Sequence, residues 1–340
     1  MIFAGPFDEF REQSRVAADY TRFAGLSFAA QIGDTSGVHV ILRSLAVLTT
    51  AGALGVSCQS PVQGWQSAVD RAAGHFLDAR IVVLDIASGR LLASRRLGDA
   101  ARTVAAPGST LKPLVLYSLI RAGRRNAASR VACNRQLVVA GHRLACSHPL
   151  APPFDAQEAL TWSCNSYFAA VARNLKPGEL GGLLRATGLL GLTGLAPQEA
   201  SAEFREPDST DSEQLALLGV DGVRVTPLEL TTAYRWLALE LAAHFDSEAA
   251  QVVRAGLEDS ASFGMAGQAS LGGVAVLGKT GTAEGASSPR THGWFVGLAP
   301  AENPQVVIAV FLPAGRGADA AHLAGDLLAN APIKADRKRP

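Results

Sequence analysis

The chain of 340 residues is poor in several features, and each scarcity excludes a class of protein. Basic and acidic residues number 31 and 30, so the chain lacks the basic excess of a nucleic-acid-binding protein. No apolar run reaches the roughly 18 residues of a clear membrane span. Only four cysteines are present, and a chain of this length can bury a core without disulfides or metals. Hydrophobic residues make up 48% of the chain, which excludes wholesale disorder and leaves a globular protein.

Lysine is also scarce, because only five of the 31 basic residues are lysine and the others are arginine. Arginine keeps its proton at any ordinary pH, whereas a desolvated lysine can lose it and act as a base. Lys334 and Lys338 lie in a polar tail, residues 331–340, and need no special explanation. The interior lysines are therefore candidates for chemistry that requires an amine.

Residues 41–60 have the layout of an export signal. Arg43 is followed by about a dozen small and apolar residues and then by Cys58. Cys58 is placed to become the lipidated first residue of a lipoprotein, although Gly55 stands where such a signal prefers leucine. Cleavage after Ala51-Gly52-Ala53 is the alternative. We expect an exported protein that acts on the periplasmic, extracytoplasmic side, anchored to the membrane, and we interpret residues 1–40 as a non-native or disordered extension.

The chain after the signal predicts a linker over residues 61–79 and one α/β domain of the α+β type over residues 80–330. Strands are predicted from the β-branched content, and helices from the spacing of apolar residues. The predicted strands are 81–86, 91–96, 274–277, 294–298 and 306–312, with a small hairpin over 137–144. The predicted helical segments are 109–121, 155–187, 227–258 and 318–328. Two strands near the start and three near the end imply a five-stranded antiparallel sheet flanked by helices, with a helical subdomain inserted.

The first chemical motif is Ser109-Thr110-Leu111-Lys112. Positions i and i+3 share one face of a helix, so a neutral Lys112 amine could take the proton of the Ser109 hydroxyl. Ser109 would also lie at a helix N-terminus, where free N–H groups favour developing negative charge. Alone, this motif is expected about once by chance in a chain of this length.

Two further motifs follow in the chain. In Ser163-Cys164-Asn165, a hydroxyl and an amide can relay a proton and hold a carbonyl, although both residues are also common helix caps. In Lys279-Thr280-Gly281-Thr282, a cation beside hydroxyls offers a seat for a carboxylate, and Gly281 lets a ligand approach the backbone. The alternative for this segment is a plain turn after an edge strand.

The order and spacing of the three motifs resemble the signature of the serine penicillin-recognising enzymes. The chain is most similar to the transpeptidase domain of penicillin-binding proteins, over about residues 80–330. The flanking runs that also look like this family are residues 106–113, 222–230, 278–283 and 294–300.

The resemblance implies a role for each motif residue. Ser109 would be the acylated nucleophile, Lys112 its general base, and Ser163 a proton carrier to the leaving amine, while Asn165 would orient Lys112 and the substrate amide. The segment Lys279-Thr280-Gly281-Thr282 would bind substrate, with Lys279 and Thr282 on the terminal carboxylate of a D-Ala-D-Ala stem peptide or of a β-lactam inhibitor. The backbone N–H groups of Ser109 and Thr282 would form the oxyanion hole.

The resemblance also implies a function and partners. We expect a D,D-transpeptidase or D,D-carboxypeptidase of peptidoglycan stem peptides that needs no cofactor and works with other cell-wall synthesis proteins. A serine β-lactamase is one alternative, since Glu206 lies between the second and third motifs, but the asparagine expected shortly after it is replaced by Ser209-Thr210. A non-catalytic sensor of β-lactams or muropeptides is another.

The cysteines and histidines suggest no metal. Cys133 and Cys146 flank the hairpin 137–144 and could form a disulfide in an exported protein, or could be two separate buried thiols. We interpret Cys164, inside the second motif, as a small buried residue. The seven histidines show no metal-ligand spacing, so we expect no zinc.

Overall fold

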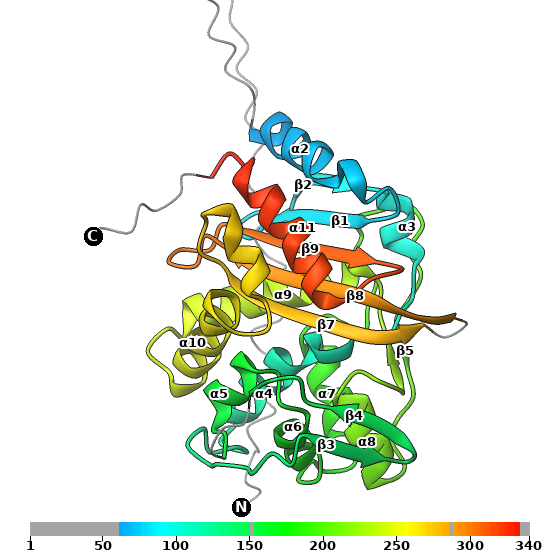
Figure 1. Ribbon diagram of the computed structural model, residues 1–340, viewed down its shortest axis with the longest axis vertical. Helices are drawn as coiled ribbons and strands as arrows, with labels where there is room; N and C mark the ends of the chain where they lie inside the picture. The colour runs from blue at the N-terminus through cyan, green and yellow to red at the C-terminus, as the bar shows by residue number, and fades with distance from the viewer. Residues whose placement is uncertain (1–60, 150–152, 286–287, 334–340) are drawn as a thin grey trace, which may run out of the picture. The chain divides into compact units, whose positions relative to one another are not determined.

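The computed structural model describes residues 61–149, 153–285 and 288–333 (Figure 1). Residues 1–40, the export segment with Cys58, and residues 334–340 of the tail lie outside the described residues, so the expectations about them stay predictions. Within the described part of the chain, no helix is both long enough and apolar enough to cross a membrane.

A five-stranded antiparallel sheet joins the two ends of the described chain, which confirms the predicted fold class. Its strands are β1 (Arg80–Asp85), β2 (Leu91–Arg95), β7 (Leu277–Gly285), β8 (Ser288–Ala299) and β9 (Val306–Leu312). The order across the sheet is β2-β1-β9-β8-β7, so β7 lies at one edge and turns its outer side toward the helical half of the molecule (Figure 1).

The central strand β9 is buried on both faces, because all seven of its residues are apolar. Successive side chains of a strand point to opposite faces. Ile308 and Val310 accordingly belong to the core on one face, and Val307 and Phe311 to the core on the other. The sheet therefore needs a helical layer on each side.

One face is covered by α2 (Pro61–Ala72), α11 (Gly317–Ala329) and the 3-10 helix η3 (Gly267–Gly272), and Figure 1 shows α2 and α11 in front of the sheet. The other face packs on α9 (Pro227–Ala243), while α10 (Glu248–Ser262) contacts β7. Thr226 caps α9 by accepting a hydrogen bond from the Glu229 N–H, and Pro227 takes the first helical position, as its fixed φ favours.

The helical half lies below β7 in Figure 1 and packs against the α9 side of the core. Its helices are α4 (Lys112–Arg121), α5 (Ala156–Thr161), α6 (Asn165–Ala172), α7 (Glu179–Ala186) and α8 (Thr210–Leu217). A hairpin of β3 (Gln136–Val139) and β4 (His142–Ala145) lies beside them. The smaller elements are α3 (Leu97–Arg102), the pair β5 (Glu203–Phe204) and β6 (Val223–Arg224), and the 3-10 helices η1 (Ala73–His75) and η2 (Gly108–Leu111).

Four expectations about secondary structure were wrong. Residues 61–79 are not a linker, because α2 and η1 lie there and Trp65 and Val69 of α2 are buried against the sheet. The strand expected over 274–277 begins only at Leu277 and runs to Gly285 by pairing with β8, so the third motif lies inside β7 and does not follow it. The segment 155–187 is three short helices, because Ser163 and Gly178 adopt left-handed backbone conformations that no helix continues through. The segment 227–258 is likewise divided between two helices, α9 and α10, since the chain turns over residues 244–247.

Candidate active site

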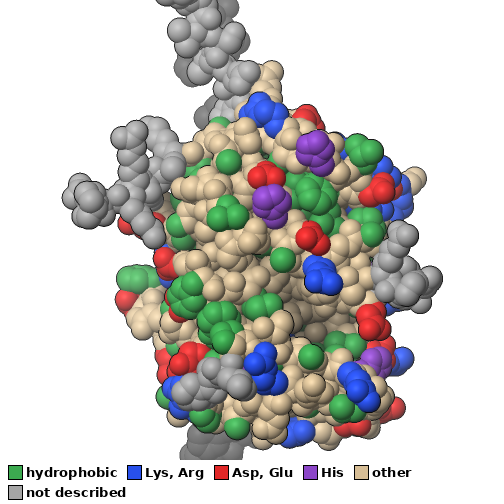
Figure 2. All heavy atoms as spheres, viewed as in Figure 1, with side chains coloured by type: hydrophobic (Ala, Val, Ile, Leu, Met, Phe, Trp, Pro, Cys, Tyr) green, Lys and Arg blue, Asp and Glu red, His purple; other side chains and the backbone are tan. Residues whose placement is uncertain are grey.

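The three motifs reach one place from three different elements. Ser109 lies in η2, which leads directly into α4 and its first residue, Lys112. Ser163 lies in the short connection between α5 and α6, and Asn165 is the first residue of α6. Lys279 lies on the edge strand β7, next to this helical half. In the space-filling view, this face is hollowed between the sheet and the helical half (Figure 2).

The Lys112 amine is fully enclosed in the site. Its side chain is 0% exposed, and Nζ donates hydrogen bonds to the Ser163 carbonyl oxygen at 2.9 Å and to Asn165 Oδ1 at 2.8 Å. Nζ also lies 3.3 Å from Ser163 Oγ and 5.0 Å from the centre of the Phe168 ring. Burial lowers the pKa of Lys112 to about 8, because the charged amine loses its hydration. A neutral amine is therefore accessible near physiological pH.

Ser163 has an unusual backbone, with φ of +55°, a left-handed conformation that non-glycine residues rarely adopt. Both of its oxygens are used: the carbonyl accepts from Lys112, and Oγ accepts a hydrogen bond from Lys279 Nζ at 2.9 Å. The Ser163 hydroxyl is thus shared by two buried amines. Strained conformations of this kind persist where the surrounding contacts determine them, which is common at functional sites.

Lys279 is also 0% exposed, and its Nζ donates a second hydrogen bond to the Thr280 carbonyl oxygen at 3.0 Å. Burial lowers the pKa of Lys279 well below its ordinary value, and the nearby Lys112 amine lowers it further. Two ammonium groups that lie close together and away from water repel each other, so the state in which only one of the two amines is protonated is favoured. A carboxylate entering the site would counter this repulsion.

The two threonines of the third motif lie on one face of β7, because side chains alternate along a strand. Thr282 Oγ1 accepts a hydrogen bond from the Gly317 N–H at 2.9 Å, which leaves its own proton free to be donated. Thr280 is buried, and its Oγ1 donates to the Met265 carbonyl oxygen at 3.4 Å. The structure thus brings Lys279 to the Ser163 hydroxyl, but it does not bring the Thr280 hydroxyl there.

Ser109 is half-buried, and its place is fixed by backbone packing on both sides. The preceding residue, Gly108, lies so close to β7 that a Cβ atom there would stand 3.0 Å from the Thr282 oxygen and 3.2 Å from the Thr282 nitrogen. From the other side, the Gly108 N–H donates to the Gly219 oxygen at 2.9 Å. Within the described residues, the Ser109 hydroxyl forms no hydrogen bond. Ser109 thus lies one turn before Lys112, without a hydrogen bond between the two side chains.

Sequence reasoning gave no role to the residues that hold the segment before Ser109. The Ala106 carbonyl accepts hydrogen bonds from Trp294 Nε1 at 2.9 Å and from His292 Nε2 at 3.2 Å. Trp294 is fully buried, so its N–H needs an internal partner. Trp294 belongs to a run that resembles the family, and that was the only available signal.

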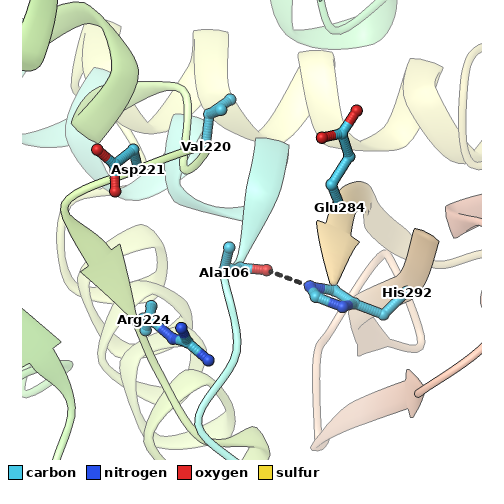
Figure 3. A pocket seen from close by; sticks show the side chains of 6 residues that line it. All are labelled: Ala106, Val220, Asp221, Arg224, Glu284 and His292. Atoms are coloured by element: carbon cyan, nitrogen blue, oxygen red, sulfur yellow. Dashed lines mark hydrogen bonds between the residues drawn. The ribbon is translucent and has the colours of Figure 1, made fainter. Parts of the chain in front are cut away.

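A small polar pocket adjoins this segment (Figure 3). Charged side chains of both signs line it, Asp221, Arg224 and Glu284, together with His292 and, from the segment before Ser109, Ala106. Figure 3 shows Arg224 and His292 on either side of Ala106. Glu284 and His292 belong to the same β7–β8 hairpin as the third motif, although none of the motif residues lines the pocket.

Three comparisons place the chain among known proteins. The sequence model of the penicillin binding protein transpeptidase domain matches residues 79–332. No curated protein matches the chain. The fold resembles the transpeptidase domain of penicillin-binding protein 3 from Burkholderia pseudomallei, with a TM-score of 0.68 at 22% identity, covering 80% of this chain and 93% of that one.

Two other solved structures are similar. A peptidoglycan glycosyltransferase from Burkholderia ambifaria has a TM-score of 0.66 at 21% identity, covering 79% of this chain and 92% of the other. Penicillin-binding protein PBP2 from Helicobacter pylori, solved in complex with MreC, has a TM-score of 0.69 at 18% identity, covering 78% of this chain and 62% of that one. At these identities the likeness concerns the fold.

Proposed function

The chain belongs to the family of penicillin-binding protein transpeptidase domains, and from this premise we propose that it is a serine acyltransferase of peptidoglycan stem peptides. Ser109 is the nucleophile, and the reaction is D,D-transpeptidation or D,D-carboxypeptidation. The observation that carries this proposal is the buried Lys112 amine, held by Ser163 and Asn165 one turn after Ser109 and with its pKa lowered to about 8.

In the first step, neutral Lys112 takes the proton of the Ser109 hydroxyl while Oγ attacks the carbonyl carbon of the penultimate D-Ala. The negative charge that develops on the carbonyl oxygen is stabilised by the backbone N–H groups of Ser109 and Thr282, which the close packing of Gly108 on Thr282 supports. The C–N bond to the terminal D-Ala then breaks, and the leaving amine receives a proton through the Ser163 hydroxyl. Finally the acceptor, an amine or water, attacks the acyl carbon, the bond from that carbon to Ser109 Oγ breaks, and the proton lost by the acceptor restores the Ser109 hydroxyl.

The terminal carboxylate would bind beside Lys279 and the hydroxyl of Thr282, whose proton is not used by its bond to Gly317. A carboxylate favours the protonated form of Lys279, because the two opposite charges attract each other. A β-lactam carries an equivalent carboxylate, and its ring-opened amine stays attached to the acyl group. We therefore expect β-lactams to acylate Ser109 and to leave slowly.

Labelling of the full chain with a fluorescent penicillin tests the nucleophile. Ser109→Ala should abolish labelling, whereas Ser118→Ala should label normally, because Ser118 lies on α4, which follows η2, and donates only to the Leu114 carbonyl. Labelling that persists in Ser109→Ala would refute the assignment. A stem pentapeptide incubated with an added amine acceptor then separates the two activities, since transpeptidation yields the amide and carboxypeptidation only the hydrolysed peptide.

A serine β-lactamase would need a base that activates water for deacylation. Glu206 is exposed, and its carboxylate lies beside Gly181 of α7, with no hydrogen bond to the motif residues among those described. Nothing about Glu206 therefore favours this alternative. An acyl-enzyme lasting minutes or longer fits the transpeptidase proposal, rapid antibiotic turnover fits a lactamase, and acylation without any peptide product fits a sensor.

We further propose that the chain works on the extracytoplasmic side, where peptidoglycan lies, held there by a lipid on Cys58. Mass spectrometry of the mature protein tests this, since a product beginning at Met1 contradicts export. The Helicobacter pylori relative was solved with MreC, and we propose that this chain also binds cell-wall synthesis proteins.

A further inference from the structure

Three cysteines and a histidine from separate segments meet beside the second motif. Cys133 precedes β3, Cys146 and His148 follow β4, and Cys164 is the residue before α6. Their sulfur atoms and a ring nitrogen of His148 all lie within 4.8 Å of one another. Cys146, His148 and Cys164 are buried and Cys133 is partly so, and none of the three described thiols is in a disulfide.

The histidine is oriented as a metal ligand requires. His148 Nδ1 lies 2.8 Å from the Pro149 carbonyl oxygen, and because a carbonyl only accepts, Nδ1 carries the proton. Nε2 is then left with its lone pair, and it lies 3.3 Å from Cys133 Sγ. The ring is also held edge-on against Phe154, with the ring centres 4.8 Å apart. A ligating histidine is typically fixed in this way through its other nitrogen.

Two of the thiols receive backbone N–H groups, which stabilise negative charge on sulfur. The Asn165 N–H donates to Cys146 Sγ at 3.2 Å, and the Arg135 N–H donates to Cys133 Sγ at 3.4 Å. Such N–H donors stabilise a metal-bound thiolate more than a neutral thiol, because hydrogen bonds to a charged acceptor are stronger. The donors therefore favour a metal site over a group of inert cysteines.

We propose that Cys133, Cys146, His148 and Cys164 bind one zinc ion in a closed, structural site. In a tetrahedral site with Zn–S bonds of about 2.3 Å, neighbouring sulfurs are about 3.8 Å apart, so the cluster needs to contract by no more than about 1 Å. Four protein ligands leave no position open, and thiolates with one imidazole select zinc over magnesium or calcium. Binding releases the protons of the three thiols to solvent.

This site was not expected from the sequence, because the spacing Cys-x12-Cys-x-His-x15-Cys contains no closely spaced cysteine pair of the kind that marks zinc motifs. The hairpin of β3 and β4 brings the first three ligands together, and the α5–α6 connection adds the fourth. Because Cys164 lies between Ser163 and Asn165, zinc would tie the residues that hold Lys112 to this hairpin. The proposed role is thus to position the second motif.

Metal analysis of the full chain, purified with its thiols reduced and with zinc present, tests the proposal. We expect about one zinc per chain, and a Co²⁺-substituted protein with the visible spectrum of tetrahedral thiolate coordination. Cys146→Ser and His148→Ala should each weaken zinc binding at least about 100-fold, since even the loss of an outer partner can cost that much. His142→Ala, which changes a histidine of β4 that is not in the cluster, should bind zinc normally.

A wild-type chain without zinc under these conditions, or one with a disulfide between two of the cluster cysteines, would overturn the proposal. So would an octahedral Co²⁺ spectrum, or equal zinc content in His148→Ala and His142→Ala. These wild-type measurements remain decisive even if Cys146→Ser fails to fold. Zinc content does not depend on reaction with penicillin, so the zinc site and the acylation of Ser109 can fail separately. If both hold, removing zinc with a chelator should slow acylation.

Discussion

The position of Ser109 depends on Gly219, a glycine that lies outside the three motifs. It ends α8 with φ of +67°, and its own N–H and that of Val220 bond back to Ala216 and Leu215, which is a Schellman motif. A Cβ atom at Gly219 would stand 2.2 Å from the Gly108 oxygen and 2.7 Å from the Gly108 nitrogen. Ordinary contacts of a Cβ atom begin at 3.4 Å, so Gly219→Ala must displace the residue before Ser109 by more than about 1 Å.

A displacement of this size has a calculable effect on the reaction. Misplacing a reacting group by about 1 Å can cost about 100-fold in rate, which is about 2.7 kcal/mol of barrier. We therefore expect Gly219→Ala to be acylated about 100-fold more slowly by a fluorescent or chromogenic β-lactam. Stability should fall as well, by about 1 kcal/mol for the left-handed backbone and by about 1–3 kcal/mol for the overlap.

Gly123→Ala is the matched control. Gly123 ends α4 in the same Schellman motif with φ of +65°, but no atom lies within 4 Å of a Cβ atom built there. This variant loses the same backbone freedom without the overlap, so it should be acylated at the wild-type rate. Acylation is measured on protein shown to be folded by circular dichroism, and urea unfolding gives the stabilities. Equal acylation rates in the two variants would refute the reasoning.

Three further predictions follow from individual side chains. Acylation should speed up about tenfold between pH 7 and pH 9, because the neutral fraction of a Lys112 amine with a pKa of about 8 rises from about a tenth to about nine tenths. Acylation rates measured by stopped flow across this range test the prediction, and rates that do not change with pH would contradict Lys112 as the base. Trp65→Ala should lower the free energy of unfolding, measured by urea titration, by about 3–4 kcal/mol, because Trp65 of α2 is only 4% exposed. Acylation of the folded protein should not slow, since Trp65 is far in sequence from the motifs. A loss below about 1 kcal/mol would mean that α2 does not support the sheet. Ser163→Gly should be about 1 kcal/mol more stable than Ser163→Ala, because only glycine adopts φ of +55° without strain. Both variants should be acylated at least about 100-fold more slowly than the wild-type chain. Equal stabilities of the two variants would contradict the strain at Ser163.

Much of the fold could be predicted from local patterns. Strands such as Val306–Leu312 are apolar throughout, and Pro227 after Thr226 opens a helix, so these elements follow from neighbours in the chain. The prediction of a linker over residues 61–79 was wrong because the structure of this segment depends on residues far away in the chain. Whether α2 packs on the sheet depends on β2 and α11, and α11 lies more than 200 residues further along the chain.

The sequence by itself determined which residue types are available for chemistry: three motifs in a fixed order, two of the few lysines among them, and a family resemblance that the family comparison confirms. Only the tertiary structure decided that Lys112 and Lys279, from a helix and an edge strand, lie against one serine hydroxyl, and that three cysteines and a histidine converge next to it. Burial lowers the pKa values of the two amines. Their shared partner, Ser163, lies 51 residues from Lys112 and 116 residues from Lys279 in the chain, and only folding brings the three side chains within a few ångströms of one another.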